Sequence, residues 1–290
     1  INIYLEKSPS EIFQLIIIFS AASFKLIPSF NLIMQSFQTI RYSEPSIKII
    51  ISILNQNVFT DVNHPNKSKN LKFNKNVRLD NISFSFNKDQ HLLKNLNLSI
   101  KKNQTIGIVG KSGSGKTTLV DLISGLLYPD SGNIFVDNFN IRGYEYLWKK
   151  KISYVSQNIY IFNDSILNNI AFAVDNSKID TDKVMEVVKN ANLLEYVNSQ
   201  NNGINQIIGE SGISLSGGQL QRIGIARALY RESEVIIFDE STSSLDNDSQ
   251  KEIMDYIYSL ENKTKIIIAH RLSILDRCDK IINLNSLNNG

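Results

Sequence analysis

The sequence predicts an α/β domain with a largely parallel sheet, preceded by one long apolar helix. After Val77, short apolar runs alternate with helical stretches, and this alternation is typical of parallel strands connected by helices. A glycine-rich loop follows the apolar run at 106–109 and comes directly before a helical stretch. Before position 61 the chain is different, because residues 12–24 carry no charge at all.

Strands are expected at 106–109, 134–136, 152–155, 235–238 and 266–269. Helices are expected at 119–127, 184–197, 219–230 and 249–260. The polar stretch 61–76, rich in Asn and Lys, is predicted to be a linker. The folded α/β domain is therefore expected to begin at Val77 and to continue to Gly290.

Composition excludes few functions. The chain has 290 residues, 31 basic and 28 acidic side chains and a formal net charge of +3, so no nucleic-acid partner is expected. The single cysteine, Cys278, rules out an internal disulfide and fits a reducing compartment. The chain starts with Ile1 and has no signal-peptide pattern. We therefore expect a fragment whose upstream part is missing.

The apolar N-terminal segment leaves two interpretations open. A helix from Pro9 to Arg41 would be roughly 50 Å long, more than the bilayer core of about 30 Å. An apolar run as short as 12–24 is also common in buried core helices. Pro28 favours a kink in this helix.

The segment Gly110-Lys-Ser-Gly-Ser-Gly-Lys-Thr117 predicts a phosphate-binding loop. Its glycines let successive backbone N–H groups turn toward one anion, and the helix that follows adds its dipole. Lys116 is expected to reach the β- and γ-phosphates, and Thr117 to ligate Mg²⁺. The residues predicted to bind ATP here are Gly110, Lys111, Ser112, Gly113, Ser114, Gly115, Lys116, Thr117 and Thr118.

Two adjacent acids, Asp239 and Glu240, follow the apolar run 235–238. Neighbouring side chains on a strand point in different directions, so one acid can face a metal ion while the other addresses a water molecule. We predict Asp239 as a ligand of Mg²⁺ and Glu240 as the general base.

The pentapeptide Leu215-Ser216-Gly217-Gly218-Gln219 opens the helix predicted at 219–230. Ser216 is suited to cap this helix, and the two glycines expose backbone N–H groups at its positive end. Such a turn forms a second anion-binding site.

With these motifs in this order, residues 77–290 resemble the nucleotide-binding domain of the ATP-binding cassette (ABC) family. The resemblance implies a P-loop NTPase with a RecA-like parallel core, an antiparallel β subdomain and a helical subdomain at about 158–228. It implies ATP and Mg²⁺ as ligands and an ATPase activity. It also implies a dimer, in which Ser216 to Gln219 of one subunit close over the ATP of the other.

The same resemblance assigns further residues. Gln157 would sense Mg²⁺ and the transport domain, and His270 would contact the γ-phosphate. Asp246 ends the loop 243–246 that would cross the dimer seam. Glu210, in the element 209–212 typical of exporters, would meet the coupling helix of the partner's transport domain.

Phe86 stands where family members place an aromatic residue that stacks on adenine. Stacking needs only the ring, so Phe in place of the more common Tyr is acceptable. Phe84, two residues earlier on the same predicted strand face, is the alternative.

The exporter-type element at 209–212 also changes the interpretation of the N-terminus. Residues 1–60 resemble the end of the transmembrane domain of a half-transporter, with the last membrane span continuing into the cytosol. We expect an inner (plasma) membrane protein with a cytoplasmic nucleotide-binding domain and a truncated C-terminus. Its partner would be a second half-transporter, identical or related.

The segment Ala22 to Asn31 resembles the corresponding helix of lipid-linked oligosaccharide flippases. Lys25 there would face a cavity or extend to the membrane interface. The alternative from another class is a soluble regulatory ABC ATPase whose N-terminal helix binds another protein. A phosphate-loop enzyme outside the family, such as a kinase, is disfavoured by Leu215 to Gln219.

Overall fold

The computed structural model describes residues 9–55, 71–86, 92–209, 215–240, 245–269 and 271–287. The chain divides into two compact units, Ile1–His64 and Pro65–Gly290. Each unit is described by itself below.

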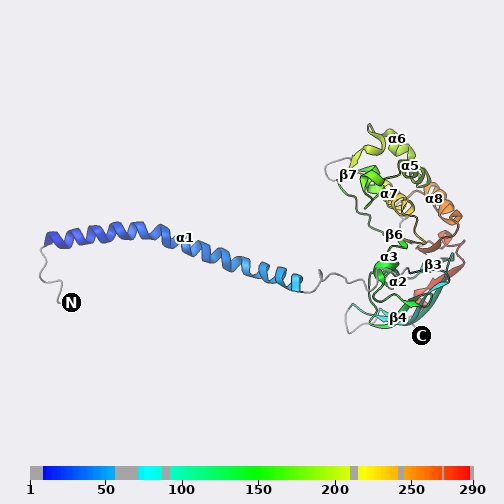
Figure 1. Ribbon diagram of the computed structural model, residues 1–290, viewed down its shortest axis with the longest axis horizontal. Coiled ribbons are helices and arrows are strands. Elements are labelled where there is room, and N and C mark those ends of the chain that lie inside the picture. The colour runs from blue at the N-terminus through cyan, green and yellow to red at the C-terminus, as the bar shows by residue number, and fades with distance from the viewer. Residues whose placement is uncertain are drawn as a thin grey trace. The chain divides into compact units, whose positions relative to one another are not determined.

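The first unit consists of one helix, α1 (Pro9–Asn55), of 47 residues. At about 1.5 Å per residue it is about 70 Å long, and it extends beyond the predicted end at Arg41. Pro28 and Pro45 lie inside it, and Figure 1 shows a continuous, gently curved helix. By length and composition α1 is able to cross a membrane.

A five-stranded parallel sheet forms the centre of the second unit, in the order β11-β3-β10-β9-β6. Its strands are β3 (Thr105–Val109), β6 (Ile152–Val155), β9 (Val235–Asp239), β10 (Thr264–Ile268) and β11 (Lys280–Asn283). β9 and β10 are buried along their whole length, as expected for strands covered on both faces.

An antiparallel sheet, β2-β1-β4-β5, packs near the parallel one. Its strands are β1 (Asn76–Phe84), β2 (Leu93–Lys101), β4 (Ser131–Val136) and β5 (Phe139–Asn140). The strand predicted at 134–136 belongs to this sheet and not to the parallel one. A short third sheet pairs β7 (Asp164–Ser165) with β8 (Ile207–Ile208).

The folded domain begins before the predicted boundary at Val77. Leu71 and Phe73 were predicted to lie in the linker 61–76, but both are buried in the core. The Phe73 ring meets the buried Trp148 edge-on, at 5.5 Å between centroids. The Asp137 carboxylate accepts hydrogen bonds from the three backbone N–H groups of 74–76, at 2.8, 2.8 and 3.0 Å. The entering chain is thus fixed to the domain by both apolar and polar contacts.

Helices of the second unit fall into two groups, which Figure 1 shows as separate lobes. α2 (Lys116–Ser124) and α3 (Glu145–Lys149) lie with the sheets. The other lobe holds α4 (Ile166–Ile170), α5 (Thr181–Asn190), α6 (Leu194–Ser199), α7 (Gly217–Tyr230) and α8 (Asn247–Ser259). The remaining short elements are α9 (Leu284–Leu287) and the 3₁₀ turns Asn176–Lys178, Gly203–Asn205 and Leu272–Ile274.

The single helix predicted at 184–197 is two helices, α5 and α6, because the chain turns at Asn192. This residue has a positive φ of 56°, which is incompatible with a continuing right-handed helix. Asn tolerates that conformation better than most residues.

Two apolar clusters cover the two faces of the parallel sheet. Along β9, Val235 and Ile237 belong to the cluster shared with α2, α3 and the antiparallel sheet. Ile236 and Phe238 belong to the cluster shared with α5, α7 and α8. Because the side chains of β9 pack alternately into the two clusters, its carboxyl end is fixed between the two lobes. The loops that follow β3 and β6 lie next to it.

Candidate nucleotide site

The predicted phosphate loop connects β3 to α2 and curls around its own lysine. Lys116 Nζ donates to the carbonyl oxygens of Gly110 and Lys111, both at 3.1 Å. Gly113 and Gly115 have φ angles of 77° and 92°, which glycine adopts without strain. The Ser114 hydroxyl is buried and has no hydrogen-bond partner within the described chain. Backbone and side-chain donors are therefore gathered around one small space.

Gly110 is required by packing rather than by its φ angle. A Cβ atom at this position would lie 2.4 Å from Ser114 Oγ. A side chain at position 110 would therefore have to displace the Ser114 hydroxyl.

The two acids at the end of β9 meet the first residues of α2. Thr117 Oγ1 donates to Asp239 Oδ2 at 2.9 Å, and Lys116 Nζ lies 3.9 Å from Glu240 Oε1. The Lys116 and Glu240 side chains are only 7% and 13% exposed. Residues about 120 positions apart in the sequence thus form one cluster at the carboxyl end of the parallel strands.

Glu240 leaves the strand with a φ of 49°, in the left-handed region. Its backbone N–H donates to the carbonyl of Ile268 on β10 at 3.1 Å. Its carboxylate accepts a hydrogen bond from Gln157 Nε2 at 3.0 Å. A non-glycine residue in this conformation is strained, and such strain is concentrated at functional sites.

The oxygens of Thr117 and Asp239 fit a magnesium ion. Mg²⁺ prefers hard oxygen ligands such as a hydroxyl and a carboxylate. Thr117 Oγ1 and Asp239 Oδ2 lie side by side, joined by a hydrogen bond of 2.9 Å, so both would be able to hold one ion. The third predicted ligand, Gln157, uses its amide nitrogen for Glu240, so only its oxygen is suited to a metal. Its metal role stays a prediction.

Two residues of this cluster were not predicted from the sequence. Tyr154, on β6, donates its hydroxyl to Asp239 Oδ2 at 3.0 Å. Burial, and then the charges of Asp239 and Asp121, raise the pKa of Tyr154, which keeps the hydroxyl a donor. Burial and the Asp239 charge also raise the pKa of Asp121. A usable signal existed for Asp121, because it stands four residues after Thr117 and so shares its helix face.

The turn at 215–219 has the predicted capping geometry. Ser216 Oγ accepts from the Gln219 backbone N–H at 3.2 Å, and Gln219 Oε1 accepts from the Ser216 N–H at 2.8 Å. This capping box starts α7 at Gly217, two residues earlier than predicted. Among the described residues, no hydrogen bond or ion pair joins this turn to the phosphate loop of the same chain.

Phe86 and Phe84 differ sharply in exposure. Phe84 is 7% exposed and belongs to the core, whereas Phe86 is 68% exposed. The prediction that they share a strand face is wrong, because β1 ends at Phe84 and the two rings meet at 90°. Only Phe86 presents a ring that a planar ligand can reach. Its role in stacking on adenine stays a prediction.

Asp246 caps α8 by accepting from the Ser249 N–H at 2.9 Å. It also lies 3.4 Å from the Arg222 guanidinium. Glu210, His270 and residues 243 and 244 lie outside the described residues.

An aromatic cluster lies just after Gln157 in the chain. The rings of Tyr160 and Phe162 meet at 5.0 Å between centroids, and Phe162 stacks on Phe172 at 4.6 Å. All three side chains are exposed. Arg227 lies 5.6 Å above the Phe172 ring and borders, with it, a hollow of about 440 Å³. The three rings thus form an exposed apolar patch, and such patches often mark interaction sites.

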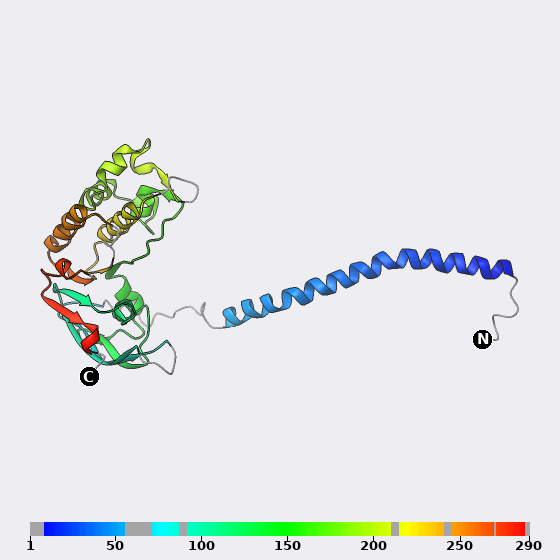
Figure 2. The same ribbon diagram turned by 180° about the vertical axis from the view of Figure 1, so that it is seen from behind.

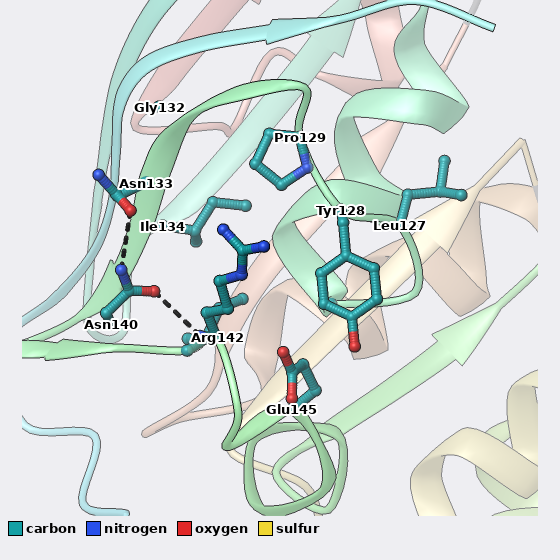
Figure 3. A pocket seen from close by; sticks show the side chains of 11 residues that line it. Leu127, Tyr128, Pro129, Gly132, Asn133, Ile134, Asn140, Arg142 and Glu145 are labelled. Carbon is teal, nitrogen blue, oxygen red and sulfur yellow. Dashed lines mark hydrogen bonds between the residues drawn. The ribbon is translucent and has the colours of Figure 1, made fainter. Parts of the chain in front are cut away.

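A separate hollow, shown in Figure 3, lies at the opposite end of α2 from the phosphate loop. Tyr128, Arg142 and Glu145 border it, and a chain of hydrogen bonds joins Arg142 N, Asn140 and Asn133. None of the predicted site residues lines it.

A phosphate loop, two acids after a buried strand and a parallel sheet define this chain as a P-loop nucleotide-binding protein. The sequence profile of the family described as "ABC transporter" matches residues 93–243. The chain therefore belongs to the ABC transporter family and carries its ATPase domain, which confirms the predicted fold.

Several transport proteins resemble this chain. It is 38% identical over 249 residues to the lactococcin-G-processing and transport ATP-binding protein LagD of Lactococcus lactis subsp. lactis, covering 86% of this chain and 35% of the relative. It is 39% identical over 209 residues to the ATP-dependent lipid A-core flippase of Escherichia coli (strain K12), covering 71% and 36%.

Among solved structures, a bacterial Atm1-family ABC exporter with ATP bound matches 76% of this chain and 39% of its own, at 30% identity and a TM-score of 0.71. The chain thus spans little more than a third of the length of the relatives it matches.

Proposed function

We propose that this chain is the ATP-hydrolysing end of an ABC exporter half-transporter, with α1 as its last membrane-spanning helix. The main support is the cluster of four side chains at the carboxyl end of the parallel strands. Thr117 Oγ1 lies 2.9 Å from Asp239 Oδ2, and Lys116 Nζ lies 3.9 Å from Glu240 Oε1. The relatives described above are named as transport proteins, a flippase and an exporter.

In this proposal the chain's own residues position ATP and water. The phosphate loop and Lys116 hold the phosphates. Glu240 takes the proton of the attacking water, while the hydrogen bond from Gln157 holds its carboxylate in place. Thr117 and Asp239 would hold Mg²⁺, which neutralises charge on the phosphate oxygens. His270 would add a contact to the γ-phosphate, and Phe86 would stack on the adenine.

A second subunit completes the site. The capping box fixes the shape of the turn 216–219 through the N–H groups of Ser216 and Gln219, and the turn has no bond to its own phosphate loop within the described chain. It is therefore available to ATP on another cassette, so the partner is a second half-transporter, identical or related.

Helix α1 supports the membrane assignment. Large apolar side chains are exposed along the whole helix, from Phe13 to Leu54. A helix that is apolar all round is suited to lipid or to a helix bundle rather than to water. We infer an inner-membrane location with the second unit in the cytoplasm. A regulatory helix of a soluble protein would instead need a polar face.

The aromatic cluster Tyr160, Phe162 and Phe172 is the surface that we assign to contact with the membrane part. It begins three residues after Gln157, whose amide bonds the proposed base. A displacement of this surface would therefore reach Glu240 through a short piece of chain. Glu210 would take part in the same contact.

The proposal for the transported substrate rests on the segment Ala22 to Asn31 and on Lys25 within it. Lys25 carries a positive charge, which suits an anionic substrate. We propose a lipid-linked oligosaccharide. The full-length protein, reconstituted in vesicles, should move a polyprenyl-pyrophosphate glycan across the bilayer. Transport of a peptide or drug with no movement of the glycan would contradict this assignment.

The test of the ATPase assignment is Glu240→Gln, with Glu234→Gln as the matched control. Both acids flank β9, but Glu234 is at its far end and pairs with Lys102 and Lys151. Loss of a general base lowers turnover by about 10²- to 10⁴-fold. Glu240→Gln should therefore lose hydrolysis but keep ATP bound in a closed dimer, whereas Glu234→Gln should hydrolyse ATP normally. Normal turnover by Glu240→Gln would contradict the base assignment.

A further inference from the structure

Arg222 connects three segments that are far apart in the sequence. It lies on α7, six residues after the cap Ser216. Its guanidinium donates to the carbonyl of Asn192 at 3.2 Å and to Ser249 Oγ at 2.6 Å. It also lies 3.4 Å from Asp246 Oδ2. One side chain thus joins α7, the turn between α5 and α6, and the start of α8.

The turn after α5 is bound to α8 at two further points. Asn192, held at a φ of 56°, donates its side-chain amide to Glu252 at 2.7 Å. Asn190 donates to the Tyr256 hydroxyl at 2.9 Å. The polar bonds therefore repeat along α8, from Ser249 to Tyr256.

Apolar packing follows the same grouping. Ile253, Met254 and Ile257 of α8 belong to the cluster that contains the buried valines of α5 and the isoleucines of α7. Both ribbon views show α8 alongside these helices, in the lobe opposite the antiparallel sheet (Figures 1 and 2). α8 also packs on the parallel sheet, because its apolar residues share this cluster with Ile236, Phe238 and Ile267, and Lys265 of β10 donates to the carbonyl of Tyr258 at 3.0 Å. The bonds of Arg222 therefore join the helical lobe to a helix that is anchored on the sheet.

We propose that Arg222 is a positioning residue that fixes the turn 216–219 and Asp246 to each other, so that the turn on the helical lobe and the start of α8 on the sheet keep one relative position. This inference rests on the proposed function, in which both elements face the second subunit. The turn 216–219 and Asp246 then approach the second subunit in a fixed relation to each other, and closure over the partner's ATP needs both in place. Loss of Arg222 leaves each element folded but sets it free from the other.

The experiment uses the full-length protein in lipid nanodiscs with the Glu240→Gln change, and compares Arg222→Lys with Arg231→Lys. Lysine keeps the charge but lacks the planar fork that reaches several acceptors. Arg231 follows the opposite end of α7 as its C-cap, and it donates a hydrogen bond to the carbonyl of Lys149. Two readouts are needed: binding of a fluorescent ATP analogue to the open protein, and ATP-dependent closure measured by energy transfer between the two subunits.

Arg222→Lys should bind the analogue as the parent does, yet need about two- to thirtyfold more ATP to close. Arg231→Lys should behave as the parent in both readouts. A merely structural role would weaken nucleotide binding and closure together. Glu252→Ala, an exposed change that removes only the bond from Asn192, should shift closure in the same direction by less.

Closure of Arg222→Lys at the parent's ATP concentration would overturn the inference. Failure of the Glu240→Gln parent itself to close would instead overturn the proposed dimer. The two failures are therefore distinguishable.

Discussion

Tyr154→Phe is the sharpest test of how the metal ligand is held. The change keeps the ring, which packs on the apolar cluster beneath the antiparallel sheet. It removes only the hydroxyl that donates to Asp239 Oδ2 at 3.0 Å. The same oxygen accepts from Thr117 at 2.9 Å. If Thr117 turns to the metal, Tyr154 remains as the donor that orients the carboxylate.

The size of the effect follows from this single bond. A hydrogen bond to a charged group contributes about 1.5–3 kcal/mol. Removing a partner that orients a metal ligand commonly costs about 10- to 100-fold in metal affinity. Because Asp239 stays fixed on the buried strand β9, we expect the lower end, about tenfold. Turnover at saturating Mg²⁺ should change by less than about twofold, since the hydroxyl that is removed donates to Asp239, the proposed metal ligand.

The assay is a Mg²⁺ titration of ATP hydrolysis, with a parallel titration of thermal stabilisation by Mg²⁺ and ATP. Tyr258→Phe is the matched control, because that hydroxyl donates to the carbonyl of Ile274 far from the nucleotide site. An unchanged Mg²⁺ requirement in Tyr154→Phe would refute the positioning argument. So would a large loss of turnover that saturating Mg²⁺ does not restore.

Three further predictions concern single residues. Burial and the neighbouring carboxylate of Asp239 raise the pKa of Asp121, so the ionised Asp121 lowers the stability of the folded protein at neutral pH. Asp121→Asn should therefore raise the melting temperature at pH 7.5. The gain should vanish below about pH 4, where Asp121 is protonated in the unfolded state as well. Phe86→Ala should weaken ATP binding by about 0.5–1.5 kcal/mol, as measured by calorimetry, and Phe86→Tyr should leave ATP binding unchanged. Phe84→Ala should instead unfold the domain at a lower denaturant concentration, because the Phe84 ring is in the core. Asp137→Ala removes three hydrogen bonds to the backbone and should destabilise the domain by about 1.5–3 kcal/mol in urea unfolding, with a smaller loss for Asp137→Asn. If Asp137→Ala were as stable as the parent protein, the entering chain would be held by apolar packing alone.

The phosphate loop and the buried strands were predictable because their signals are local. The strand at 152–155 has the predicted bounds, since a short apolar run between polar residues leaves little choice. The cap Ser216 was likewise predicted from residues within one turn of it. Where chemistry and conformation depend on neighbours in sequence, pattern and structure agree.

The features that were missed depend on contacts distant in sequence or on broken patterns. β1 and β2 contain Asn81 and Asn95 at positive φ, with register shifts nearby, so their apolar alternation is interrupted. Three of the four residues of β11 are exposed, and an edge strand of this kind has no apolar run to detect. Tyr154 meets Asp239 across 85 positions, through the pairing of β6 with β9, which no local pattern encodes.

Glu240 illustrates how a correct prediction can have an incomplete reason. Strand alternation predicted that Asp239 and Glu240 point differently, and they do have different partners. The strand, however, ends at Asp239, and Glu240 turns away through a left-handed backbone that costs about 1–2 kcal/mol for a residue with a Cβ. Its N–H bond to Ile268 and its carboxylate bond from Gln157 offset that cost. The proposed base is therefore held by β10 on one side and by the loop after β6 on the other, so a displacement of either alters its position.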